Sequence, residues 1–391
     1  MIGALISAVA LSSAAPSAPV PRLAPERPEP YPLAYIQEFH HELQRVADHP
    51  RTVGLAVAIL EAGEPVYIFT GGELAKGSAR SVNRETLFRA ASVTKTFTGT
   101  LVALLEEEGL VDLDAAVPDD VISLKAERAP TWRELITHQT GLVSNAYDTL
   151  IEDGRSAEYA RERLGGIDLL CTLGSCYTYQ NVAFSGIEAL VEDATNLSFE
   201  DAMQTYLLEP LGLDTAGFGA EHLAANGNWA RPHRGRAGRV GGPRSHYDDL
   251  PSAASLAVSL DDMIGWAQAL LREDSLLDRA VVERAFTPQT ETRRETRGLR
   301  RLNRVRESDY AYGWRVYNWA DQYTLIAHGG ALSGYGSQIV LEPESGFGFI
   351  ALWNADLGLV RSLWPTAVEM RFETGDAPFV EDTLERMRRA R

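Results

Sequence analysis

The chain has 391 residues, of which 45% are hydrophobic and 33 are glycine, a composition typical of a globular enzyme with a substantial core. This length could hold two or three average domains, although single large catalytic domains are common. The formal net charge of −17 argues against nucleic-acid binding, because no overall basic balance is available to neutralise phosphates.

The first 32 residues have the pattern of an export signal followed by a linker. Residues 2–11 form an apolar run that is too short for a stable membrane span, small residues follow, and residues 19–32 are rich in proline. We therefore expect an exported protein, periplasmic or secreted, with no stable membrane span elsewhere. No Lys or Arg precedes the apolar run, so a disordered arm is the alternative.

After residue 32, the spacing of apolar residues predicts strands toward both ends of the chain and helices between them. Apolar spacing predicts a helix over residues 35–47, and Val- and Ile-rich runs predict a hairpin over 53–70. Helical patterns then dominate from residue 92 to about residue 271. Strand patterns return over 323–353, and a closing helix is expected from about residue 360 to 372.

This order predicts an α/β fold of the α+β type. An antiparallel sheet would be built from both chain ends and flanked by helices, with an all-helical domain inserted. The main domain is expected to cover residues 33–375, with the sheet part at about 33–90 and 310–375 and the helical part at about 91–309. Residues 376–391 are expected to form a charged C-terminal tail.

A Ser-x-x-Lys tetrad, Ser92-Val93-Thr94-Lys95, opens the first long helical pattern. Residues three apart share a face of a helix, so the Ser92 hydroxyl and the Lys95 amine can lie side by side. A serine hydroxyl becomes a good nucleophile only when a neighbouring base takes its proton, and a desolvated lysine can assist. The tetrad alone is weak evidence, because short motifs arise by chance.

Two further elements follow in the chain. Tyr179-Gln180-Asn181 is a Tyr-x-Asn element, and His328-Gly329-Gly330 opens a predicted strand. Tyr179 is a candidate general base if a nearby cation lowers the pKa of its phenol from the usual value of about 10. Asn181 could share a face with it and donate its amide to a substrate acyl group.

The three elements, in this order and with these separations, resemble the serine β-lactamase and penicillin-binding-protein superfamily. The resemblance is closest to the branch of class C β-lactamases, D-Ala-D-Ala carboxypeptidases and family VIII esterases. It extends from about Tyr35 to Phe372 and includes three scaffold phrases, at residues 131–142, 208–213 and 312–314.

The resemblance implies a groove between the sheet and the helical part, in which Ser92 forms an acyl-enzyme with Lys95 and Tyr179 as its catalytic partners. The backbone N–H groups of Ser92 and Ala331 would form the oxyanion hole. No metal or organic cofactor is implied. Whether Lys95 or Tyr179 removes the serine proton stays open.

His328 departs from the family pattern, because the lactamase members usually carry lysine at this position. A histidine is mostly neutral near pH 7, so it binds a substrate carboxylate less well than a permanent cation. We therefore expect small carboxylic esters first, D-amino-acid peptides second and β-lactams third. Gly330 would leave room for a substrate along the strand edge. A binding or scaffold protein that kept the fold and lost the activity is the alternative.

Other features are less specific. Cys171 and Cys176 could form a disulfide before Tyr179 or remain reduced thiols, and no metal site is expected from them. The Arg-rich loops at 226–246 and 293–306 could attract anions, but solvated loops are the simpler interpretation. His138 is interpreted as structural, and the sequence specifies no oligomeric state.

Overall fold

The computed structural model describes residues 34–293, 296–297, 302, 304–375 and 378–389. The expected export signal and half of the Arg-rich stretch at 293–306 lie outside the described residues. None of the helices in the described part combines the length and apolar character that a bilayer crossing requires.

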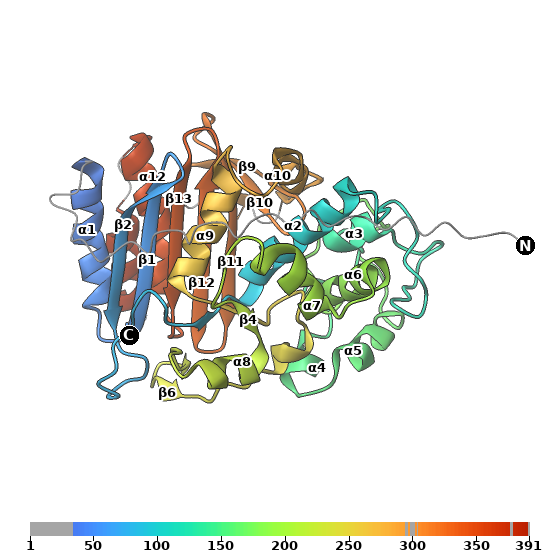
Figure 1. Cartoon of the computed structure of the whole chain (residues 1–391), viewed down its shortest axis with the longest axis horizontal. Helices are drawn as coiled ribbons and strands as arrows, with labels where there is room; N and C mark the ends of the chain where they lie inside the picture. Colours follow the sequence, from blue (N-terminus) through green and yellow to red (C-terminus); the bar gives the residue numbers. More distant parts are fainter. Residues whose placement is uncertain (1–33, 294–295, 298–301, 303, 376–377, 390–391) are drawn as a thin grey trace, which may run out of the picture.

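The main sheet has eight strands in the order β2-β1-β13-β12-β11-β10-β9-β8, and every neighbouring pair is antiparallel (Figure 1). The sheet joins the two chain ends, because β1 pairs with β13. The strands are β1 (Gly54–Glu61), β2 (Glu64–Gly72), β8 (Thr290–Glu291), β9 (Val305–Tyr310), β10 (Arg315–Trp319), β11 (Tyr323–Leu332), β12 (Tyr335–Glu342) and β13 (Phe347–Trp353). The predicted α+β fold with a sheet from both ends is confirmed.

Both faces of the central strands are buried, in two separate cores. Along β1, Leu55, Val57 and Ile59 face one core, and the alternate residues Ala56, Ala58 and Leu60 face the other. This alternation follows from the two-residue repeat of a strand. One core lies under α1 (Ala34–Ala47), α12 (Leu363–Phe372) and α13 (Phe379–Arg389), and the other lies under α2 (Thr94–Glu107) and α9 (Leu260–Leu271).

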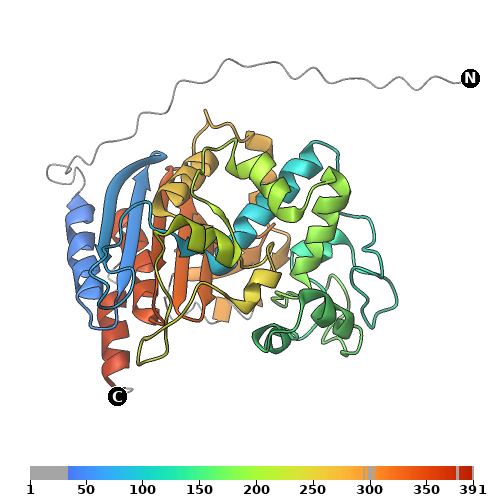
Figure 2. The ribbon, with the colours of Figure 1, turned by 60° about the horizontal axis from the view of Figure 1, so that its bottom comes forward.

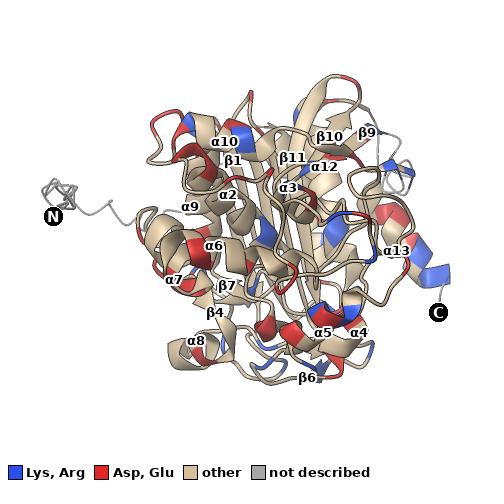
Figure 3. Ribbon diagram, turned by 90° about the vertical axis from the view of Figure 1, so that its right-hand side faces the viewer, with Lys and Arg blue, Asp and Glu red and all other residues tan. Residues whose placement is uncertain are grey.

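The helical part stands beside the sheet, around α2 (Figures 1 and 2). Its other helices are α3 (Trp132–Ile136), α4 (Asp148–Glu152), α5 (Ala157–Leu164), α6 (Ile187–Thr195), α7 (Phe199–Met203), α8 (Gly219–Asn226) and α10 (Arg279–Phe286). Figure 3 shows acidic residues on α4, α6 and α7, with arginines beside them on α5.

The region between residues 91 and 309 is not entirely helical. It contributes to two small sheets, β3-β7-β4 and β5-β6, and α9 packs on β1 and β13 of the main sheet. The small strands are β3 (Phe88–Arg89), β4 (Gly217–Phe218), β5 (His233–Arg234), β6 (Arg239–Val240) and β7 (Leu256–Val258). The charged C-terminal stretch, expected only as a tail, contains α13, because Phe379 and Val380 are buried on the sheet side.

Candidate active site

Ser92 lies in a single 3₁₀ turn, η1 (Ala91–Val93), which leads directly into α2. Ala91 has a φ of +49°, a conformation that costs energy for a residue with a Cβ. The turn packs against β11 and β12, and the Ser337 hydroxyl of β12 donates to the Ala90 carbonyl oxygen. The start of α2 is thereby fixed against the sheet, which holds Ser92 at the junction of the two parts.

Gly330 makes this close approach possible. A Cβ at Gly330 would fall well inside contact distance of the Ala90 carbonyl oxygen and of Ser337 Oγ. From the sequence, the missing side chain of Gly330 was expected to leave room for a substrate along the strand edge. In the structure, the same absence lets β11 lie against the turn that carries Ser92.

Lys95 is completely buried on α2. Its Nζ donates to Asn181 Oδ1 at 2.7 Å and to the Ala253 carbonyl oxygen at 2.8 Å. Burial lowers the pKa of Lys95 to about 7, with the charge of Asp148 acting in the opposite direction and that of Arg315 adding to the decrease. A sizeable fraction of this amine is therefore neutral near pH 7 and can accept a proton.

The Tyr179 ring lies beside this amine, with Lys95 Nζ 4.9 Å from the ring centroid. The Tyr179 hydroxyl is buried and has no regular hydrogen-bond partner among the described residues, although the Ser92 hydroxyl approaches closely enough to favour the phenolate. Burial raises the pKa of Tyr179 to about 12, and the Arg315 charge opposes this rise. Tyr179 is therefore a neutral phenol at neutral pH, and the charge that lowers its pKa is that of Arg315 and not that of Lys95.

Asn181 connects Lys95 to a carboxylate that the sequence did not reveal. Its Oδ1 accepts from Lys95, and its Nδ2 donates to Asp148 Oδ2 at 2.6 Å. Asp148 is largely buried, which raises the pKa of its carboxyl. The Asn181 amide, expected to serve the substrate, is here engaged by protein groups on both sides.

A directed chain of hydrogen bonds passes through His138, Tyr310 and His328. The Gln180 backbone N–H donates to His138 Nδ1 at 3.2 Å, so His138 Nε2 carries the hydrogen that it shares with Tyr310 Oη at 3.1 Å. Tyr310 then donates to His328 Nε2 at 3.4 Å, and His328 Nδ1 donates to the Gly329 carbonyl oxygen at 3.1 Å. The backbone amide at one end and the carbonyl at the other assign one tautomer to each ring.

Both histidines are neutral. Burial lowers the pKa of His328 and of His138 well below the usual value, and the charges of Arg315 and Lys95 lower it further. His138 also has a φ of +59°, which is uncommon for a residue with a side chain. His328 thus has a neutral ring where lactamase members usually carry a lysine.

Arg315 is the permanent cation of the site and was missed from the sequence. Its guanidinium carbon lies 5.4 Å from the Tyr179 ring centroid and 5.7 Å from that of Tyr310. It stands at the start of β10, just after the phrase Tyr312-Gly313-Trp314, and no local pattern distinguishes it from other arginines in the chain. Only the pairing of β10 with β11 brings it to the site.

Ala331 is exposed and lines a cavity of about 650 Å³ that extends from β11 to the helical part. The Gly- and Arg-rich loop contributes Arg234, Arg244 and His246 to its wall, and Tyr247 lies beside them. Strand β10 pairs with β11 only between Tyr323 and Ala327 of β11. Within the described strands, the edge of β11 from His328 onward therefore has no partner on the β10 side.

Cys171 and Cys176 form a disulfide in the loop that precedes Tyr179. Of the two possibilities that the sequence left open, the structure has the bonded one. No group of three or more His, Cys, Asp or Glu side chains within the described ranges could hold a metal ion.

The Beta-lactamase family model matches residues 39–368, which is most of the chain. The chain belongs to the Beta-lactamase family. It is 26% identical over 329 residues to a protein named penicillin-binding protein 4 from Amycolatopsis lactamdurans, covering 81% of this chain and 84% of that one. It is 24% identical over 356 residues to a β-lactamase from Escherichia coli K12, covering 81% and 87%.

Three further proteins are similar to this member of the Beta-lactamase family, but the match covers less of the relative's length or has a lower sequence identity. A D-aminopeptidase from Gluconobacter oxydans is 29% identical over 313 residues, and the match spans 77% of this chain but 55% of that protein. The octameric penicillin-binding protein homologue from Pyrococcus abyssi has a similar structure, with a TM-score of 0.78 at 21% identity over 88% of this chain and 80% of that one. EstCE1, described as a hydrolase with promiscuous acyltransferase activity, has a TM-score of 0.71 at 19% identity over 86% and 98%.

Proposed function

We propose that this Beta-lactamase family member is a serine hydrolase that cleaves an ester or amide bond through an acyl-enzyme on Ser92. The observation that carries the proposal is the convergence of three distant segments. Ser92, Lys95 and Tyr179 meet at the junction of the sheet and the helical part, with a buried amine whose pKa is lowered to about 7.

The reaction would begin with attack of Ser92 Oγ on the substrate carbonyl carbon, while the neutral Lys95 amine takes the hydroxyl proton directly or through Tyr179. The N–H groups of Ser92 and Ala331 would stabilise the developing oxyanion. Collapse of the intermediate breaks the bond to the alcohol or amine, which leaves with a proton. Water then attacks the acyl-enzyme with the same base and releases the acid.

The neutral ring of His328 supports an order of substrates. Without a permanent cation at that position, a carboxylate on the substrate loses a binding partner that the lactamase members usually have. We therefore propose small carboxylic esters first, D-amino-acid peptides second and β-lactams third.

The proposal is tested by covalent labelling with a fluorophosphonate probe. Wild type should be labelled and Ser92→Ala should not, because the variant lacks the nucleophile. Tyr179→Phe should fold and react at least about 10²-fold more slowly, the range of general acid–base catalysis. Ser156→Ala, which removes a remote serine that caps α5, serves as the control and should label normally.

Turnover of p-nitrophenyl acetate, a D-Ala-D-Ala peptide and nitrocefin should then follow the proposed order. Labelling that survives in Ser92→Ala would exclude Ser92 as the nucleophile. Absence of both labelling and turnover in the wild type would favour a binding or scaffold protein with this fold.

We also propose that the protein is exported. The disulfide between Cys171 and Cys176 supports this, since such bonds persist in oxidising compartments. Fractionation of cells that produce the full chain should recover it outside the cytoplasm. Recovery only from the cytoplasmic fraction would contradict the proposal.

A further inference from the structure

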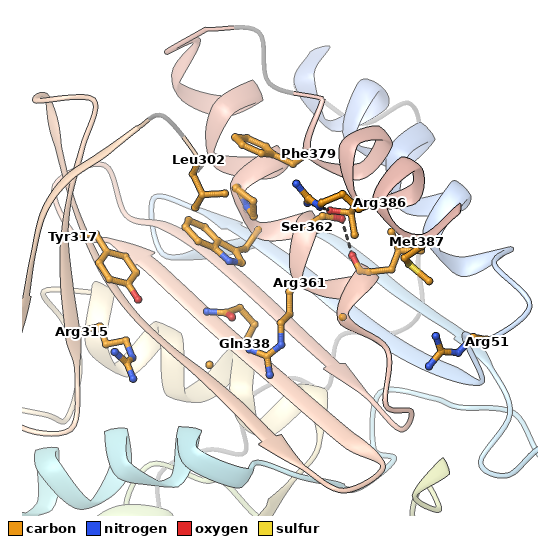
Figure 4. Close-up of a pocket in the computed structure, with 16 residues that line it drawn as sticks. Arg51, Leu302, Arg315, Tyr317, Gln338, Arg361, Ser362, Phe379, Arg386 and Met387 are labelled. Atoms are coloured by element: carbon orange, nitrogen blue, oxygen red, sulfur yellow. Dashed lines mark hydrogen bonds between the residues drawn. The ribbon is translucent and has the colours of Figure 1, made fainter. Parts of the chain in front are cut away.

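A second cavity, of about 720 Å³, lies between the sheet and the helices α12 and α13 (Figure 4). It is on the opposite face of β12 from Ser92. Ser337 faces the turn that carries Ser92, so the next residue, Gln338, faces away from it and lines this cavity. Tyr317, Trp364 and Phe379, which also line it, belong to the core on that face.

The charge of the wall is one-sided. Of the described residues that line the cavity, four are arginines and none is Asp or Glu, although the whole chain has a net charge of −17. The arginines come from separate parts of the fold: Arg51, Arg315, Arg361 and Arg386.

Arg361 is the most informative of them. Its Nη2 donates to the Gly330 carbonyl oxygen at 2.9 Å and its guanidinium lies over the Trp353 ring, and no ion pair joins it to a carboxylate in the described part of the chain. Burial lowers the pKa of Arg361, and the neighbouring charge of Arg315 lowers it further. A guanidinium that is partly buried beside a second cation is unfavourable unless a bound anion neutralises the charge.

The rest of the wall is apolar and aromatic. Leu359, Trp364, Phe379 and Met387 line the cavity together with the amide of Gln338. In Figure 4, Arg361, Gln338 and Arg315 lie toward one end, and Leu302 and Phe379 lie toward the other. The volume is in the range of pockets that hold small organic molecules, and it is large for an inorganic ion.

We propose that this cavity binds an amphiphilic organic anion, whose carboxylate or phosphate head pairs with Arg361 and whose apolar body lies against Trp364 and Phe379. A guanidinium can hold either head group through two parallel hydrogen bonds. The cavity shares Arg315 with the surroundings of Tyr179, but Arg361, Trp364 and Phe379 lie on the face of the sheet opposite Ser92. The proposal does not depend on catalysis by Ser92.

Calorimetric titration of the Ser92→Ala protein tests the proposal, because binding there cannot come from acylation. Octanoate and octyl phosphate should bind, octylammonium should not, and inorganic phosphate should bind at least tenfold more weakly than octyl phosphate. The comparison of octanoate with octyl phosphate identifies the preferred head group. Equal affinity for octanoate and octylammonium, or no binding of either anion, would overturn the proposal.

Variants then locate the site. Arg361→Met should weaken octanoate binding at least tenfold and Arg386→Gln several-fold. Arg389→Gln on the same helix is the matched control and should bind normally, since Arg389 pairs with Glu385 and does not line the cavity. Should Arg361→Met fail to fold, Arg386→Gln and the charge preference of the unsubstituted cavity decide.

A last measurement separates the two sites. Wild type that has been labelled on Ser92 with the fluorophosphonate should still bind octanoate with unchanged affinity. Loss of binding after labelling would assign octanoate to the catalytic groove and reject the second site. If the wild type takes up no label, the proposed function fails, while the titration of the Ser92→Ala protein still decides this inference.

Discussion

Lys95 lies in an environment that lowers the pKa of its amine. It is buried, it donates to two neutral oxygens, and the charge of Arg315 opposes its protonation. Burial and the charge of Arg315 outweigh the opposing charge of Asp148 and lower the pKa of Lys95 to about 7, whereas burial raises that of Tyr179 to about 12. Of the two candidate bases, Lys95 is therefore the one available near neutral pH.

This difference predicts the pH dependence of the reaction. The amine accepts a proton only in its neutral form, so the rate of fluorophosphonate labelling should rise as pH increases through about 7 and level off above it. Well below pH 7 the rate should fall about tenfold per pH unit. Lys95→Arg, which remains charged, should lose this rise, and an unchanged profile in that variant would exclude Lys95 as the base.

The sequence predicted the residues that define the site better than it predicted their surroundings. Ser92, Lys95 and Tyr179 lie in short recognisable elements, and the structure brings them together. Arg315 and Tyr310 come from strands whose sequence carries no chemical pattern, so only tertiary pairing reveals them. The roles of all these residues stay predictions until they are measured.

At the scale of elements, the contact between η1 and β11 determines where Ser92 stands. Gly330 is the point of closest approach. Gly330→Ala should force the turn away from the strand, with a loss of about 1–3 kcal/mol in the free energy of unfolding from overpacking. The rate of labelling should fall as well, because the nucleophile moves relative to β11.

Gly358→Ala is the control for this substitution. Gly358 begins the 3₁₀ turn η6 (Gly358–Ser362), and a Cβ there meets nothing within 4 Å. Chemical denaturation and labelling should leave it close to wild type. If Gly330→Ala also left the stability and the labelling rate unchanged, the close contact would not position Ser92.

Element boundaries were predicted well where the pattern was repeated along the sequence. The β1–β2 hairpin and the helix α1 have apolar residues at the spacing of their type, and both are confirmed. Short strands such as β3 and β7 have too few residues to display a period, and they form only because the chain folds back on itself. Amphipathic α13 was overlooked because its charged residues dominate its composition.

At the scale of the whole molecule, the sheet separates two cores, and only one of them adjoins the candidate active site. Ser92 and Lys95 adjoin the core under α2, whereas α1 closes the opposite face. Phe39 on α1 is fully buried and packs edge-on against Tyr67 and Phe349. The two faces should therefore respond to substitution independently.

Phe39→Ala tests this separation. The cavity that it leaves should cost about 3–5 kcal/mol in the free energy of unfolding, measured by chemical denaturation. Labelling of Ser92 well below the unfolding midpoint should stay at the wild-type rate. Leu110→Ala, at a side chain that is 46% exposed, is the control and should change stability by less than about 0.5 kcal/mol. A large decrease in labelling by folded Phe39→Ala would show that the faces are coupled.

The pairing of β1 with β13 also constrains how the protein can be made. Leu55 pairs with Trp353, so the ribosome must add all the residues between them before β1 gains its second neighbour, β13. Until then the β1–β2 hairpin exposes apolar side chains on both of its faces, and such exposure favours aggregation. Holdase chaperones that bind nascent chains are therefore expected to engage this protein early and to release it only after synthesis ends.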